Sequence, residues 1–298
     1  MEKSKYDKAI QNHPFSLTDK EVSDKVNKLL SEKFGENNKR EVYKLLYSCI
    51  DLTTLNTTDT REDVWRFTEK VNDFDGSNPE IENVAAICVY PNLVATVKEA
   101  LTADVRIAAV SGGFPTSQTF TEVKIAETAL AVADGADEID IVLSLGLFLN
   151  EEYEEMCEEI GEIKDACHGA LLKVILETGA LKTVGDIHRA SVLALYSGAD
   201  FLKTSTGKIY PGASPEAVYT MCLAIKSYYE KTKNKVGIKV SGGVSSVEDA
   251  VKYYTIVKET MGEEWLSPTL FRIGTSRLAD ILLKETDMFK TIIPERLK

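Results

Sequence analysis

Three lysines lie in short apolar segments that are spaced like successive strands: Lys173 in LLKVILET, Lys203 in FLKTSTG and Lys239 in GIKVSGG. Neighbouring parallel strands lie about 4.8 Å apart, so three such ammonium groups could converge at one end of a sheet. A lysine beside another cation has a lowered pKa and yields the neutral amine that attacks a carbonyl carbon. One lysine of this kind could equally extend to solvent. Three on successive strands favour Schiff-base chemistry.

A carboxylate lies in the same frame as these lysines. GADEID and GADFLK place Asp140 and Lys203 at equivalent positions, each following a glycine that is expected to end the preceding helix. We expect Asp140 to pair with Lys173 on the next strand and to move protons through a water. The sequence has three histidines, none at an expected strand end, and no cluster with metal-ligand spacing, so a zinc-dependent enzyme is disfavoured. They are His13, His168 and His188.

Three glycine-containing turns predict a phosphate site. They are Thr204-Ser-Thr-Gly-Lys208, Ser241-Gly-Gly243 and Gly274-Thr-Ser-Arg277, each after an expected strand. Glycine lets backbone N–H groups approach an anion, and a helix starting after the turn adds its positive dipole end. Such turns are common in loops between strands and helices, so it is the three together that favour an anion site.

The elements that must hold these residues alternate regularly. Helical spacing is expected at 20–34 and 39–48, ahead of eight strand-like runs at 48–52, 84–89, 105–110, 137–144, 171–176, 200–203, 236–240 and 270–273. This rhythm predicts an α/β protein with a (β/α)8 TIM barrel and extra N-terminal helices. We expect one domain over 1–298, with a helical extension (1–47), a barrel (48–284) and a tail (285–298). The acidic segment 151–162 is expected to be an outer helix with a solvated face, capped by Asn150 and without a catalytic role.

Composition excludes several classes of protein. The net charge of −12 argues against a nucleic-acid binder, and no run approaches the ~18 apolar residues of a membrane span. The five cysteines have no CxxC spacing, which favours reduced thiols in a cytoplasmic protein. The first residues lack the apolar core of a signal peptide.

Seven segments together resemble the deoxyribose-phosphate aldolase family, in order and at family spacing, between about residues 48 and 284. They are DLTTLN (51–56), AAICVYP (85–91), ADEIDIVLSLG (136–146), LLKVILETG (171–179), GADFLKTSTGK (198–208), VGIKVSGGV (236–244) and FRIGTSRL (271–278). The resemblance implies reversible cleavage of 2-deoxy-D-ribose 5-phosphate to D-glyceraldehyde 3-phosphate and acetaldehyde, through an imine and without a cofactor. The partners would be these small molecules, and a homodimer is one assembly the chain could form.

The resemblance also implies roles for individual residues. Lys203 would form the Schiff base, Asp140 and Lys239 would assist proton transfer, and Lys173 would order Asp140. The phosphate would be held by residues of the three turns: Thr206, Gly207, Lys208, Gly242, Gly243, Ser276 and Arg277. Asp51, Thr53 and Leu55 match pocket residues of the family, although packing or turn roles fit them equally. Cys88 matches a pocket-side cysteine, and a buried small side chain is the favoured interpretation.

Two departures and two alternatives stand beside this interpretation. Well-known bacterial members end in a tail with a terminal tyrosine, whereas no tyrosine follows Tyr254 here, which puts a tail-assisted proton step in question. Val240 stands where the family often has proline or alanine. Another Schiff-base aldolase could act on a different phosphorylated sugar, decided by pocket residues such as Thr53, Leu55 and Phe114. A catalytically silent sugar-phosphate sensor is the other alternative, although it would gain nothing from a desolvated amine.

Overall fold

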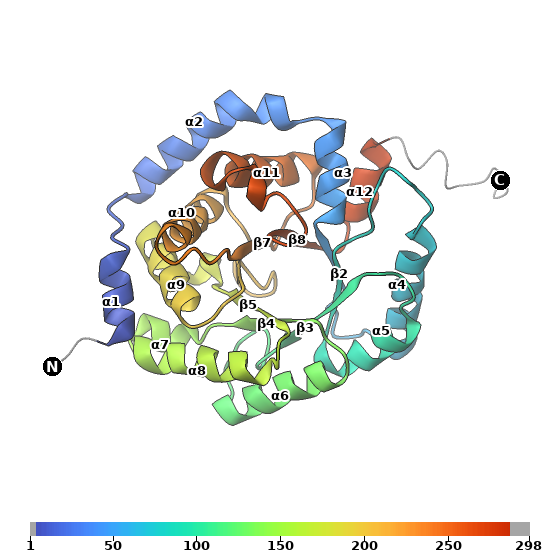
Figure 1. The fold of residues 1–298 in the computed structure, drawn as a ribbon, viewed down its shortest axis with the longest axis horizontal. Helices are drawn as coiled ribbons and strands as arrows, with labels where there is room; N and C mark the ends of the chain where they lie inside the picture. Colours follow the sequence, from blue (N-terminus) through green and yellow to red (C-terminus); the bar gives the residue numbers. More distant parts are fainter. Residues whose placement is uncertain (1–3, 287–298) are drawn as a thin grey trace.

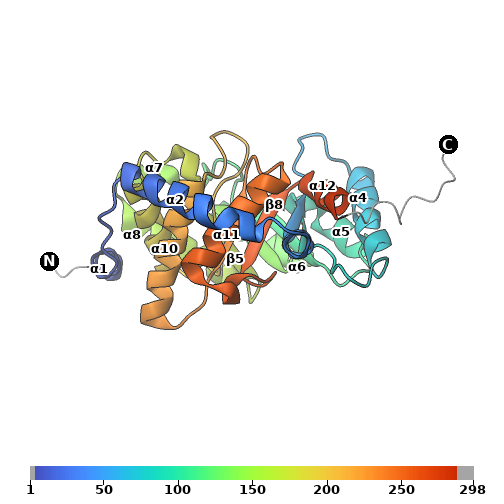
Figure 2. The same cartoon turned by 90° about the horizontal axis from the view of Figure 1, so that it is seen from above.

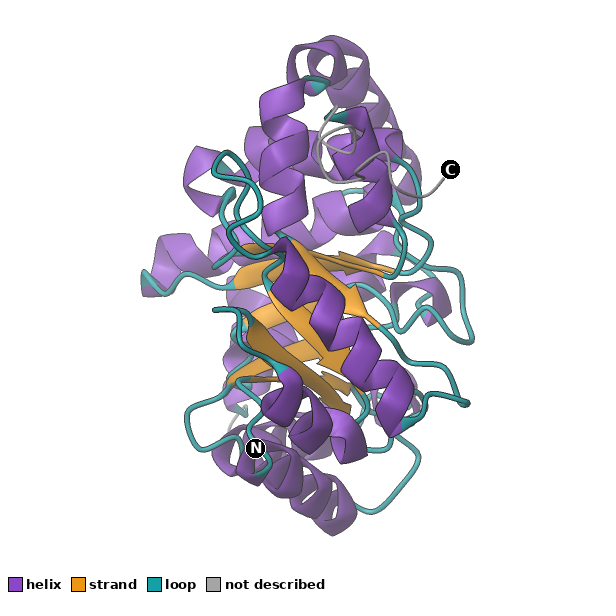
Figure 3. Cartoon of the chain, turned by 90° about the vertical axis from the view of Figure 1, so that its right-hand side faces the viewer, coloured by secondary structure: helices purple, strands orange, loops and turns teal. Residues whose placement is uncertain are grey.

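The computed structural model describes residues 4–286, and within that range the strands form a closed parallel barrel in the order β1-β2-β3-β4-β5-β6-β7-β8. Helices surround the barrel (Figure 1), and from the side the strands form a central layer inside a helical coat (Figure 3). The strands are β1 (Ile50–Thr53), β2 (Ala86–Val89), β3 (Arg106–Ser111), β4 (Glu138–Val142), β5 (Leu171–Ile175), β6 (Phe201–Lys203), β7 (Gly237–Ser241) and β8 (Phe271–Thr275). The predicted TIM barrel is therefore confirmed.

The helices mostly follow the strands in alternation. They are α1 (Lys5–Asn12), α2 (Asp19–Asn37), α3 (Arg40–Ser48), α4 (Arg61–Phe74), α5 (Val94–Ala100), α6 (Thr121–Ala133), α7 (Leu145–Leu149), α8 (Tyr153–Ala166), α9 (Val184–Tyr196), α10 (Pro215–Thr232), α11 (Val247–Met261) and α12 (Leu278–Glu285). Single turns of 3-10 helix are η1 (Pro91–Leu93), η2 (Thr178–Ala180) and η3 (Glu263–Trp265). The expected tail, 285–298, lies almost wholly outside the described residues.

Local sequence signals explain where several helices begin. The Thr18 hydroxyl accepts from the backbone N–H of Glu21 at the start of α2, and the Glu21 carboxylate accepts from the backbone N–H of Thr18 in return. The Ser214 hydroxyl accepts from the backbone N–H of Ala217 at the start of α10, with Pro215 in the first turn. Gly135 and Gly198, just before β4 and β6, have φ values of 109° and 102°, as their expected role at helix ends requires.

The N-terminal helices lie outside the ring of barrel helices. α2 crosses α10 and α11 (Figures 1 and 2), and α1 packs on α9. The His13 ring, just after α1, hydrogen-bonds the Ser227 hydroxyl at 2.7 Å and the Tyr196 hydroxyl at 3.0 Å. These contacts fix the first part of the extension to the helices on the side of the barrel.

The acidic segment differs from the prediction in two respects. The expected cap at Asn150 is wrong: Asn150 ends α7, and α8 begins at Tyr153 without a side-chain cap. Glu159 does not lie on a solvated face, because it is 7% exposed and accepts from the buried Lys124 ammonium at 2.8 Å. This ion pair joins α6 to α8, and the sequence spacing alone could not show which acidic residue would turn inward.

Candidate active site

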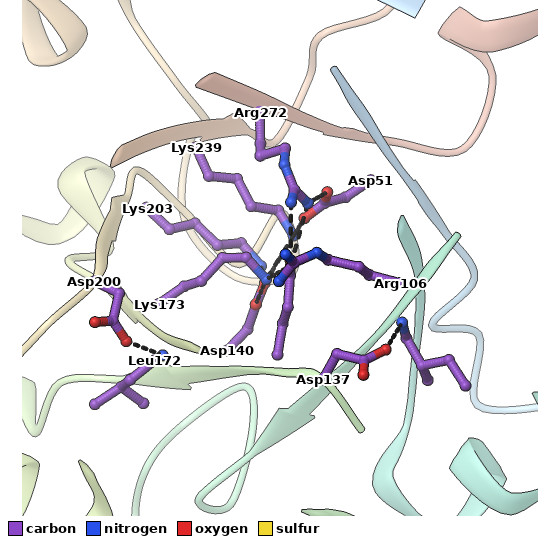
Figure 4. Close-up of polar contacts among 12 residues, drawn as sticks. Asp51, Arg106, Asp137, Asp140, Leu172, Lys173, Asp200, Lys203, Lys239 and Arg272 are labelled. Carbon is purple, nitrogen blue, oxygen red and sulfur yellow. Dashed lines mark hydrogen bonds and ion pairs between the residues drawn. The ribbon is translucent and has the colours of Figure 1, made fainter. Parts of the chain in front are cut away.

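Charged side chains converge inside the barrel from β1, β4, β5, β6, β7 and β8, that is, from all the strands except β2 and β3 (Figure 4). Strand register aligns them, because Asp140 pairs with Lys173 across β4 and β5, and Lys203 pairs with Lys239 across β6 and β7. The opposite side of the interior is apolar and small. It is formed by Leu55, Ala86, Cys88, Ala108 and Val110.

Asp140 is the centre of the cluster and is completely buried. Its Oδ1 accepts from Lys173 Nζ at 2.6 Å, and its Oδ2 accepts from both Lys203 Nζ and Lys239 Nζ at 2.8 Å. All three ammonium groups are at most 3% exposed. The lysines predicted to converge therefore do so around the carboxylate that was expected to pair with one of them.

The three lysines differ in how many carboxylates surround them. Lys173 Nζ lies 2.7 Å from Glu138 and 3.7 Å from Asp51, in addition to Asp140. Lys239 Nζ lies 2.5 Å from Asp51 Oδ2. Among the described residues, Lys203 makes an ion pair with Asp140 alone. Lys203 is therefore the least neutralised ammonium group of the three.

These contacts separate the pKa values of the lysines. Burial lowers the pKa of Lys203, Asp140 opposes that effect, Lys239 adds to it, and the net result is a lowered pKa. Burial also acts on Lys173 and Lys239, but the neighbouring carboxylates outweigh it and raise the pKa of both. For Asp140, the lysines outweigh burial and hold its pKa well below the ordinary value. A neutral amine beside an ionised carboxylate suits nucleophilic attack on a carbonyl.

A cavity of about 550 Å³ opens above this cluster at the C-terminal ends of β1, β6, β7 and β8. Lys203 reaches it from below. The predicted substrate-binding residues that line it are Thr53, Leu55, Thr206, Gly207, Lys208, Gly242, Gly243, Ser276 and Arg277. The three glycine-containing turns thus face one cavity, with the two side-chain cations Lys208 and Arg277 at its rim.

Other predicted site residues lie below the cavity. Asp51 is fully buried in the charged cluster, where its Oδ1 accepts from Arg272 at 2.6 Å. Cys88 is fully buried in the small apolar cluster, and burial raises the pKa of its thiol. Neither lines the cavity. Both could affect a substrate there only through other side chains.

The helix that follows each turn begins after a different number of residues. α12 begins directly after Arg277, and α11 begins at Val247, four residues after Gly243. α10 begins at Pro215, seven residues after Lys208, so the expected helix dipole does not directly follow the first turn. Instead, Lys208 Nζ donates to the carbonyl of Leu55 at 2.5 Å and ties this turn to the loop after β1.

The sequence interpretation missed three residues around the site. Glu138 and Arg272 lie inside the barrel at 0% and 2% exposure and pair with each other at 2.8 Å. Both stand in buried strands, so the rule that singled out the lysines could have found them. Glu177, with φ 50°, accepts from the backbone N–H and hydroxyl of Thr206 at 3.2 and 2.6 Å. No local pattern marks this contact between two loops.

Comparison with known proteins agrees with this geometry. The family model of DeoC/LacD family aldolases matches residues 46–267. A Caenorhabditis elegans relative is 42% identical over 89% of this chain and 88% of its own length. The human deoxyribose-phosphate aldolase is 40% identical over 77% of this chain and 76% of its own length.

A solved structure supports the same assignment. The deoxyribose phosphate aldolase of Aeropyrum pernix, described as a unique tetramer, superimposes with a TM-score of 0.66 at 27% identity. The match covers 88% of this chain and 99% of that one. The fold, the buried lysine cluster and these relationships together show that the chain belongs to the DeoC/LacD family of aldolases.

Proposed function

We propose that the protein is a deoxyribose-phosphate aldolase, a carbon–carbon lyase that cleaves 2-deoxy-D-ribose 5-phosphate to D-glyceraldehyde 3-phosphate and acetaldehyde. One observation carries the mechanism: Lys203 reaches a cavity of about 550 Å³ while its Nζ has a single carboxylate partner among the described residues. Burial and the neighbouring Lys239 lower the pKa of Lys203, which favours the free base that attacks an aldehyde.

The steps follow from carbonyl chemistry. The Lys203 amine attacks C1 of the open-chain sugar, and loss of water gives an imine. Removal of the proton from the C3 hydroxyl then breaks the C2–C3 bond, which releases glyceraldehyde 3-phosphate and leaves an enamine on Lys203. Protonation of C2 and hydrolysis of the imine release acetaldehyde and restore the amine.

The side chains next to Lys203 would transfer the protons in these steps. Lys239 Nζ and Lys203 Nζ both donate to Asp140 Oδ2 at 2.8 Å. Asp140 Oδ2 could therefore accept a proton from one lysine nitrogen and pass it to the other. Lys173 occupies Oδ1 and fixes the carboxylate in this orientation. We therefore assign proton transfer to Asp140 and Lys239 and positioning to Lys173.

The three turns would bind the phosphate. Backbone N–H groups near Gly207, Gly242 and Gly243 and the side chains of Lys208 and Arg277 border the same cavity as Lys203. A dianion would be favourable here despite the net charge of −12, because the cavity rim is locally cationic. The cavity geometry supports this assignment, and it needs no cofactor.

Several finer predictions remain. Within the described residues, no helix is both long and apolar enough to cross a bilayer. A cytoplasmic location stays a prediction that the five unpaired, buried cysteines support. A homodimer and the division at residues 47 and 284 also stay predictions, and the packing of α2 on α10 and α11 supports counting the extension with the barrel.

Trapping the imine tests the function. Sodium borohydride with acetaldehyde should inactivate the protein and add one two-carbon group to the peptide that contains Lys203. With 2-deoxyribose 5-phosphate the same peptide should carry that two-carbon group once the C2–C3 bond is broken, or the whole five-carbon sugar phosphate where the first imine is reduced. An enzyme assay should detect acetaldehyde release from the sugar phosphate. An adduct on Lys173 or Lys239 would overturn the residue assignment. Absence of any adduct would favour a silent sensor, and trapping without release would favour another sugar phosphate as substrate.

A further inference from the structure

Arg272 lies on the N-terminal side of the lysine cluster and occupies two of its carboxylates. Its NH1 donates to Asp51 Oδ1 at 2.6 Å and to Glu138 Oε2 at 3.1 Å, while NH2 donates to Glu138 Oε1 at 2.8 Å. Its Nε donates to the carbonyl of Pro268. The guanidinium is therefore held in one orientation, and an arginine side chain keeps its proton under all ordinary conditions.

The buried charges balance when Lys203 is neutral. Among the described residues, the cluster has three carboxylates and three cations besides Lys203: Asp51, Glu138 and Asp140 against Arg272, Lys173 and Lys239. Protonation of Lys203 adds one uncompensated positive charge in a site where every member is at most 3% exposed. An unpaired charge in such surroundings is costly, so the proton is lost from the lysine with the fewest carboxylate contacts.

We propose that Arg272 is a positioning residue that balances Asp51 and Glu138 from the N-terminal side of the cluster and so leaves Lys203 as the amine that the cluster cannot keep protonated. This inference rests on the proposed Schiff-base function. It assigns to Arg272 an effect on Lys203 without any contact with the substrate. Arg272 does not line the substrate cavity and instead lines another cavity of about 570 Å³ at the N-terminal ends of the strands.

The other ionisable groups near Lys203 do not provide this balance. Cys88 on β2 faces the cluster, but burial raises the pKa of its thiol and keeps it neutral. Arg106 on β3 lies 3.7 Å from Glu138, but its side chain is 50% exposed, so solvent screens its charge. Asp140, Lys173 and Lys239, from β4, β5 and β7, are already counted. Apart from the lysines themselves, Arg272 is therefore the buried cation that balances the carboxylates of the cluster.

Arg272→Met should raise the pKa of Lys203. Without the guanidinium the cluster has an excess negative charge, which stabilises the Lys203 ammonium. Below that pKa the trapping rate with acetaldehyde and borohydride follows the fraction of neutral amine. The midpoint of the rate against pH should move to higher pH by about one unit or more, which is about tenfold slower trapping on the acid side.

Glu138→Gln should shift the midpoint the other way. It removes a negative charge, disfavours the Lys203 ammonium further and lets trapping begin at lower pH. The double variant R272M/E138Q removes one charge of each sign, so its midpoint should return toward that of the unchanged protein. A purely structural role for Arg272 would lower stability and rate but would not produce shifts of opposite sign that cancel.

Arg106→Met is the matched control, because it removes an arginine charge from the same carboxylate at the exposed side of the barrel. The midpoint of its trapping rate against pH should equal that of the unchanged protein. If Arg272→Met does not fold, the direction in which the pH midpoint of trapping moves in Glu138→Gln and in the double variant still tests the role of Arg272. Unmoved midpoints in folded variants would overturn the role of Arg272. Absence of any adduct on Lys203 in the unchanged protein would instead overturn the Schiff-base function itself.

Discussion

The two carboxylate oxygens of Asp140 accept hydrogen bonds from three lysines, and the way these bonds are distributed matters for turnover. Oδ1 contacts Lys173, whereas Oδ2 contacts both Lys203 and Lys239. In the proposed cycle, Lys173 and Lys239 would still donate to Asp140 when Lys203 is an imine. Asp140 would therefore keep its orientation between proton transfers, which would keep a proton acceptor beside the reacting nitrogen.

At the cavity rim, Lys208→Ala should reduce kcat/KM for 2-deoxyribose 5-phosphate by about ten- to a hundredfold. A charge-assisted contact with phosphate contributes roughly 1.5–3 kcal/mol, and the non-phosphorylated sugar cannot form it. The variant should therefore reduce the difference in kcat/KM between the phosphorylated sugar and the free sugar. Steady-state kinetics with both substrates measures this directly.

Lys70→Ala is the control for the change in net charge. Lys70 is exposed on α4 and does not line the cavity, so its loss should affect both sugars little. Equal penalties on both sugars in Lys208→Ala would place Lys208 outside the phosphate site. Its bond to the Leu55 carbonyl would then be its main contribution, as a tie between two loops.

The lysines, Asp140 and the three turns were predictable because charge and glycine are conspicuous at strand ends. Arg272 and Glu138 were equally visible as charges within apolar strands, but they lie nearer the N-terminal side, where chemistry is not expected. Glu177 was not predictable. Its contact with Thr206 depends on a backbone with φ 50° and on the packing of two loops, and neither leaves a local pattern.

At the scale of the strands, two glycines make room inside the barrel. A Cβ at Gly237 would lie 2.2 Å from the Phe201 ring, and a Cβ at Gly274 would lie 3.0 Å from Lys239 Cε. The Phe201 ring in turn lies 5.7 Å from the Arg272 guanidinium. Small residues on β7 and β8 therefore allow the large side chains of their neighbours to fill the interior.

Gly237→Ala should destabilise the protein by about 1–3 kcal/mol, because the added methyl group collides with a buried ring that cannot move freely. Gly161→Ala is a matched control, since a Cβ there meets nothing within 4 Å in the middle of α8. It should be neutral or stabilising by up to about 1 kcal/mol. Urea unfolding of the two variants makes the comparison, and equal stabilities would contradict the packing argument.

The strands were predicted to within two residues at each end, because buried parallel strands are short apolar runs between glycine-rich turns. The connections were predicted less well. α1 and α7 were missed, since each is short, and the loop after β6 extends to Ser214 before its helix begins. The lengths of such connections depend on how they pack over the barrel and not on local periodicity.

At the scale of the whole molecule, the N-terminal extension is attached through histidines that are buried uncharged. His188 on α9 stacks on Phe15 with ring centroids 4.4 Å apart. Burial lowers the pKa of His188 to about 4, and His13 adds to the effect. Because the folded form binds fewer protons than the unfolded chain, this site favours folding above pH 6.5 and loses that contribution between pH 6.5 and about 4.

The free energy of unfolding should therefore fall by roughly 3 kcal/mol more in the unchanged protein than in His188→Gln between pH 7 and pH 4. Urea unfolding across this range measures the difference in slope. The same substitution at the exposed His168 is the matched control for the loss of a histidine. Parallel curves for the His188 variant and the unchanged protein would show that this contact does not couple the extension to pH.

The ion pair between Asp51 and Arg272 joins β1 to β8, the first and last strands of the ring, which pair with each other. A chain whose last strand has not yet docked lacks that pair and leaves the lysine region open to water. Lys203 would then be an ordinary solvated amine, protonated at neutral pH. Newly made protein should thus acquire its reactivity toward aldehydes only when β8 has paired with β1. The rate at which aldehyde reactivity appears during refolding should therefore report the closure of the barrel.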